Sequence, residues 1–124
     1  MNGERQNTGK RGEDEACTFL LRSGHSIVAR NWRYSHLEVD IISRDGDGLH
    51  FVEVKTRNAP LTADPQDNVD WKKMKRLASA ARAFRRERRE FSKEELFFDV
   101  ISVVFEDGKT RLEYFPQAFV PMYV

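Results

Sequence analysis

The sequence has 124 residues, enough for one domain with its own core, and its 40% hydrophobic and 33% charged residues are typical of a globular protein. No apolar run approaches the ~18 residues of a membrane helix, the polar start is unlike a signal peptide, and the single cysteine excludes an internal disulfide. We therefore expect one domain over residues 1–124 in a reducing cytoplasm, with residues 1–7 flexible and no membrane contact.

The first predicted element is a helix from Thr8 to Ser23, with its first residue as N-cap and Gly24 just beyond its C-terminus. Glu13 lies three and seven residues before Ala16 and Leu20, so it shares the face that these apolar residues bury. An acid on that face needs a partner or a metal. The alternative is that Glu13 lies near solvent in the first turn, where the helix dipole stabilises it.

A strand over His25–Tyr34 comes next, followed by two alternating runs that flank an Asp-Gly-Asp-Gly turn, a strong hairpin signal. With the turn at the centre of the hairpin, facing residues have numbers that sum to 93. Asp40 then faces Glu53, and Glu38 faces Lys55. Because side chains alternate along a strand, we expect all four on one face of the hairpin.

This set of side chains suits phosphodiester hydrolysis. Two carboxylates about 5 Å apart repel each other unless a cation lies between them, and Mg²⁺ with oxygen ligands at about 2.1 Å fits that gap. Metal ions held by carboxylates activate water and neutralise phosphate charge, while an ammonium beside them stabilises developing charge. The alternative is a solvated hairpin face with a Glu38–Lys55 ion pair.

A basic helix is predicted after residues 58–68, whose two prolines indicate an irregular loop overhanging the hairpin site. The helix runs from Val69 to Arg89, capped by Asp67 or Asn68. Residues 72–89 hold nine Lys or Arg and one acid, so intrahelical salt bridges do not explain the charge, and we favour phosphate contact over a solvated face. The residues expected to bind nucleic acid are Lys72, Lys73, Arg76, Arg82, Arg85 and Arg86.

The C-terminal part contains an almost continuous apolar run, Leu96–Phe105, which is typical of a central strand covered on both faces. Asp99 within it is either a satisfied buried carboxylate or a residue near the site. A last strand follows over Thr110–Phe115, and the histidines lack zinc-ligand spacing. The order α-β-β-β-α-β-β predicts an α/β fold with a mixed sheet flanked by helices.

Asp40 followed by Glu53-Val54-Lys55 resembles the motif of the PD-(D/E)xK nucleases, whose restriction-endonuclease-like core has the same order of elements. Over nearly its whole length the chain also resembles the YraN family of small bacterial proteins, which are similar to Holliday-junction resolvases. The segments that carry this resemblance are Gly12-Glu13 with Ala16 and Leu20, Gly24, Arg30-Asn31, Glu38-Val39-Asp40, Phe51-Val52-Glu53-Val54-Lys55, Arg57, Val69 with Lys73, Leu77 and Ala81, Phe98-Asp99-Val100 and Ala118-Phe119.

The resemblance implies that Asp40 and Glu53 are metal ligands, that Lys55 is the catalytic lysine and that Glu13 comes from the first helix to the metal. Glu38 would support this site, and Lys73 would approach it or the phosphate backbone. The expected activity is that of an endonuclease dependent on Mg²⁺ or Mn²⁺, acting on DNA such as branched repair intermediates, with a homodimer as its form. Two other classes stay open, a nucleic-acid-binding module without turnover and an adaptor whose basic helix meets an acidic partner.

Overall fold

The computed structural model describes residues 2–60 and 71–118, with side chains from residue 8 onward except those of residues 71 and 73. Its main helices and strands follow one another in the predicted order α-β-β-β-α-β-β, which is consistent with a restriction-endonuclease-like fold. The elements are α1 (Asn2–Arg22), β1 (Ser26–Tyr34), β2 (Leu37–Arg44), β3 (Leu49–Asn58), α2 (Trp71–Glu87), the 3-10 helix η2 (Arg89–Phe91), β4 (Leu96–Glu106) and β5 (Lys109–Phe115).

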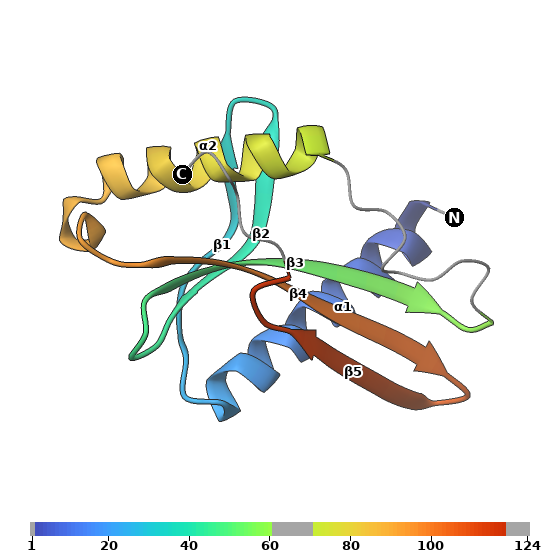
Figure 1. Ribbon diagram of the computed structural model, residues 1–124. Coiled ribbons are helices and arrows are strands. Elements are labelled where there is room, and N and C mark those ends of the chain that lie inside the picture. Colours follow the sequence, from blue (N-terminus) through green and yellow to red (C-terminus); the bar gives the residue numbers. More distant parts are fainter. Residues whose placement is uncertain (1, 61–70, 119–124) are drawn as a thin grey trace.

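The five strands form one mixed sheet in the order β1-β2-β3-β4-β5. Among the described strands, β3 and β4 alone pair in parallel, whereas the other neighbours are antiparallel. A parallel pair needs a long crossover connection, and the segment that contains α2 provides it. Figure 1 shows α2 lying across β1 and β2 while α1 runs on the other side of the sheet.

Each face of the sheet has its own hydrophobic cluster. On the α2 side Phe84 packs against Phe51, with ring centroids 6.0 Å apart, and Phe98 belongs to the same cluster. On the α1 side the buried residues include Leu20 and Ile101. The apolar strand β4 therefore supplies both clusters, which confirms the prediction that it is covered on both faces.

The ends of α1 show what the local sequence encodes. Gly24 has a φ of +94°, its N–H donates to the carbonyl of Leu21, and the N–H of His25 donates to the carbonyl of Leu20. This is the Schellman arrangement that a glycine after the helix favours, as predicted. The predicted start is wrong, because α1 begins at Asn2 and Thr8 lies inside it.

Helix α2 ends at Glu87, two residues earlier than predicted. Its proposed N-caps and most of the proline-containing loop fall outside the described residues. No helix in the described part of the chain is long and apolar enough to cross a membrane.

Candidate active site

A cavity of about 510 Å³ lies where α1 approaches β2 and β3. Four predicted catalytic residues line it together: Glu13 from α1, Asp40 from β2, and Glu53 and Lys55 from β3. The remaining lining residues are Gly9, Val54, Thr56 and Arg57. We call this the carboxylate cavity. Three acids and a lysine from three separate elements thus share one concave surface.

The cavity exists because β2 separates from β3 at Asp40. The observed pairs, from Arg44 with Leu49 to Ile41 with Val52, have the predicted register. The ladder stops one step before Asp40 would face Glu53. There Oδ2 of Asp40 accepts a hydrogen bond from the backbone N–H of Val54 at 2.8 Å. A side-chain carboxylate therefore satisfies a backbone donor where the strands diverge.

Glu13 reaches the cavity because α1 lies very close to β3. Gly12 is buried against Thr56, and a Cβ atom at Gly12 would lie 2.8 Å from Cγ2 of Thr56. Burial raises the pKa of Glu13, and the negative charge of Asp40 adds to this rise. The reading of Glu13 as a solvent-exposed first-turn residue fails, since α1 begins eleven residues earlier and Glu13 is half-buried.

Asn31 is a residue of this region whose role the sequence did not reveal. With its amide nitrogen facing the acids, it donates to Oε1 of Glu38 at 2.7 Å and to Oε1 of Glu13 at 2.9 Å. Its φ of +53° is in the left-handed region that asparagine tolerates better than most residues. Glu38 itself forms an ion pair with Arg33 at 3.4 Å and is not among the described residues that line the cavity. Asn31 thus links Glu38 to Glu13.

Lys55 is half-buried beside the acids. Burial lowers the pKa of Lys55, and the positive charge of Arg57 lowers it further. Both cations line the carboxylate cavity, so an anionic substrate there would meet two positive charges next to the three acids.

The basic residues of α2 lie elsewhere. Lys72, Arg76 and Arg86 are exposed, but none of the described side chains of α2 lines the carboxylate cavity. Arg85 is half-buried and donates to the carbonyl of Glu94 at 3.1 Å, and Arg82 lies 3.4 Å from Oγ of Ser79. The side chain of Lys73 is outside the described part. Among the described side chains, the structure therefore brings the predicted catalytic residues together but does not place the predicted phosphate-binding residues beside them.

A second polar group lies near the turn of the β2–β3 hairpin. Asp99 is 1% exposed and accepts hydrogen bonds from the Tyr114 hydroxyl at 2.6 Å and the Gln117 N–H at 2.9 Å, so it is the satisfied buried carboxylate of the first alternative. It also contacts His50, which lies close to His25 and Asp45. Sequence spacing alone missed this group. The hairpin register could have indicated it, because Ser43 pairs with His50 and Arg44 pairs with Ser26, next to His25.

Comparison with known proteins identifies the family. The model of the uncharacterised protein family UPF0102 matches residues 12–103. A UPF0102 protein of Nitratidesulfovibrio vulgaris is 43% identical over 96% of this chain and 88% of its own length. One from Bacteroides thetaiotaomicron is 38% identical over 95% of this chain and 96% of its own length. With the family model covering most of the chain and these relatives matching it nearly end to end, the chain belongs to UPF0102, the YraN family.

Proposed function

We propose that this protein is a metal-dependent endonuclease that hydrolyses phosphodiester bonds in DNA. The observation that supports this most is the joint position of Glu13, Asp40, Glu53 and Lys55 around one cavity. Carboxylates from a helix and two strands beside a lysine form the residue set that such hydrolysis requires. The membership of the chain in UPF0102 identifies relatives but not a reaction, so the proposal rests on the cavity.

The carboxylate cavity fits a hard divalent cation by its donor chemistry. Glu13, Asp40 and Glu53 would hold the ion, since Mg²⁺ and Mn²⁺ prefer carboxylate oxygens. Burial and, after it, the negative charge of Asp40 raise the pKa of Glu13, and a cation between these carboxylates would offset both effects. When bound, such an ion would supply an activated water and neutralise phosphate charge.

The protein groups have separate tasks in this proposal. The ammonium of Lys55 would bind a phosphate oxygen or orient the attacking water, and charge stabilisation of this kind acts strongly in a half-buried site. Arg57 would hold the neighbouring phosphate. Asn31 would keep Glu13 in position through its hydrogen bond to Oε1. The exposed basic side chains of α2 would contribute salt-dependent contacts to the rest of the nucleic acid.

The test is a cleavage assay on labelled duplex, single-stranded, flapped and four-way-junction DNA, and on RNA, with Mg²⁺, Mn²⁺ or EDTA. Asp40→Asn and Lys55→Met should abolish the product, whereas their exposed counterparts Asp47→Asn and Lys93→Met should cut normally. Cutting by the Asp40→Asn protein would refute the site. Preference for junctions would support branched DNA as the substrate, and light scattering with the junction would test the homodimer.

Binding without cleavage would instead support the second function, a nucleic-acid-binding module. The exposed Lys72, Arg76 and Arg86 favour it, because they lie outside the carboxylate cavity and need no catalysis. This function predicts an affinity that falls steeply with salt, and replacement of Arg76 and Arg86 should reduce the salt dependence by about one counterion per lost phosphate contact.

A further inference from the structure

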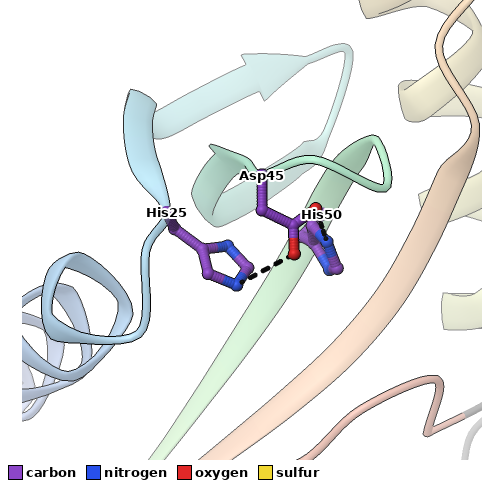
Figure 2. A group of neighbouring side chains, drawn as sticks. All are labelled: His25, Asp45 and His50. Carbon is purple, nitrogen blue, oxygen red and sulfur yellow. Dashed lines mark hydrogen bonds and ion pairs between the residues drawn. The ribbon is translucent and has the colours of Figure 1, made fainter.

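Two histidines and an aspartate converge at the turn end of the β2–β3 hairpin. His25 precedes β1, Asp45 follows β2 and His50 lies on β3. One ligand atom from each of the three lies within 4.8 Å of the others, and Figure 2 shows Asp45 between the two imidazole rings. We call this group the His–Asp cluster. None of its members lines the carboxylate cavity.

The distances in the His–Asp cluster are close to those of a metal centre. Nε2 of His25 lies 3.5 Å from Oδ2 of Asp45, and Nε2 of His50 lies 2.9 Å from Oδ1 of the same carboxylate. In a tetrahedral zinc site with bonds of about 2.0–2.1 Å, neighbouring ligand atoms are about 3.3 Å apart. The two observed distances, each to a different oxygen of Asp45, fall on either side of this value, and all three ligand atoms lie within 4.8 Å of one another. Side-chain movements that bring these atoms together would complete the site.

The outer nitrogen of each ring is already held by another residue. Nδ1 of His25 is 2.9 Å from Oγ of Ser43, and Nδ1 of His50 is 2.6 Å from Oδ2 of Asp99. Metal-binding histidines almost always have this second interaction, which fixes the ring and directs the other nitrogen at the metal. Here it leaves both Nε2 atoms facing Asp45. The two Nδ1 contacts are observations separate from the Nε2 distances.

Burial and charge favour a dication in the same place. His25, His50 and Asp99 are 8%, 6% and 1% exposed. Asp45 and Asp99 bring two carboxylates against His50 in a largely dry network, and without a metal the His50 ring balances their charge by donating from both nitrogens. A divalent ion between neutral imidazoles would balance both carboxylates. Asp45 is only half-buried, which gives an ion a route from solvent.

We propose that His25, Asp45 and His50 form a second metal site that binds a divalent transition ion such as Zn²⁺. Imidazole nitrogens select zinc-like ions over Mg²⁺, so this site would differ in preference from the all-carboxylate cavity. Three protein ligands leave a fourth position for water or another donor. The proposal does not depend on nuclease activity, because it concerns other residues and another kind of ion.

The experiment is a calorimetric titration of the full chain with Zn²⁺ after chelator treatment, with a thermal melt in parallel. We expect a saturable Zn²⁺ site at micromolar concentration that persists in Asp40→Asn, where the carboxylate cavity has lost a ligand, and a higher melting temperature, while Co²⁺ should give the visible absorption of a tetrahedral centre. His25→Gln should lower the Zn²⁺ affinity at least tenfold. The matched control His36→Gln, an exposed histidine outside the cluster, should bind Zn²⁺ as wild type does.

Asp45→Asn is the second variant, in case His25→Gln does not fold. Its amide oxygen can still accept the N–H groups of Asp47 and Gly48, so the turn is retained while a charged ligand is lost. It should also weaken Zn²⁺ binding. The proposal is overturned if wild-type protein takes up no Zn²⁺, or if the folded variants bind it as tightly as wild type.

Discussion

Replacing Gly12 with alanine tests how closely α1 must approach β3 to place Glu13 in the carboxylate cavity. Within a helix this change normally stabilises a protein by about 0.5–1 kcal/mol, because glycine loses more backbone entropy on folding. At Gly12, however, the added Cβ would lie 2.8 Å from Cγ2 and 2.9 Å from Cβ of Thr56. The Cβ of Thr56 is fixed by the backbone of β3, so no rotamer change relieves both contacts.

Overpacking of this kind costs about 1–3 kcal/mol, which exceeds the helix-propensity gain. We expect Gly12→Ala to lower the free energy of unfolding by about 1 kcal/mol, or roughly 4 °C in Tm for a domain of this size. Gly9→Ala is the matched control, because it lies one turn earlier in α1 with nothing within 4 Å of its added Cβ. That variant should gain about 0.5–1 kcal/mol.

Urea denaturation of both variants, followed by circular dichroism, measures the difference. If Gly12→Ala is stabilised as much as Gly9→Ala, the close approach of α1 to β3 is wrong. If the close approach is right and the proposed function holds, Gly12→Ala should also lose cleavage activity, because a helix that moves away from Thr56 to relieve the clash also carries Glu13 away from Asp40 and Glu53.

Three further predictions address the side chains around the two polar groups. Asn31→Asp replaces the donor between Glu13 and Glu38 with a third carboxylate and should lower the free energy of unfolding by about 1 kcal/mol at low salt. The loss should be smaller at high salt, because Asn31 is exposed, and urea titrations at both ionic strengths measure the difference. Glu13→Gln should reduce metal-dependent cleavage strongly while Glu15→Gln, exposed on the same helix, leaves it unchanged, and equal activity in the two would exclude Glu13 from the site. Asp99→Asn should lower the free energy of unfolding by about 1–3 kcal/mol, because its amide nitrogen must face one of the groups that now donate to the carboxylate. Wild-type stability of this variant in denaturant would contradict these hydrogen bonds.

The order of elements and the register of the central hairpin could be predicted because both are encoded locally. The Asp-Gly-Asp-Gly turn fixes which residues of β2 and β3 face each other, and Gly24 fixes the end of α1. The start of α1 could not be predicted from Thr8. A residue that can act as an N-cap does not start the helix when the residues before it are themselves helical.

The His50–Asp99 contact could not be predicted, because it depends on tertiary structure. It requires the parallel alignment of β3 with β4, which places His50 opposite Phe97 and Val52 opposite Asp99. No local pattern sets this alignment, since a crossover containing α2 separates the two strands. Asn31 was missed for a similar reason, because its partners Glu13 and Glu38 come from elements on either side of it in the chain.

Asp40 connects the fold to the proposed chemistry more directly than any other residue. Its carboxylate accepts the Val54 N–H at the point where the β2–β3 ladder ends, so it holds the diverging strand and faces the cavity at once. Asp40→Ala would leave that N–H without its acceptor and should destabilise the protein by about 1–3 kcal/mol. Asp40→Asn retains an acceptor oxygen and should stay near wild-type stability while losing the charge that a metal needs. A folded Asp40→Asn protein that cannot cut DNA would therefore separate the catalytic role of this carboxylate from its structural one, whereas loss of activity in Asp40→Ala alone would not.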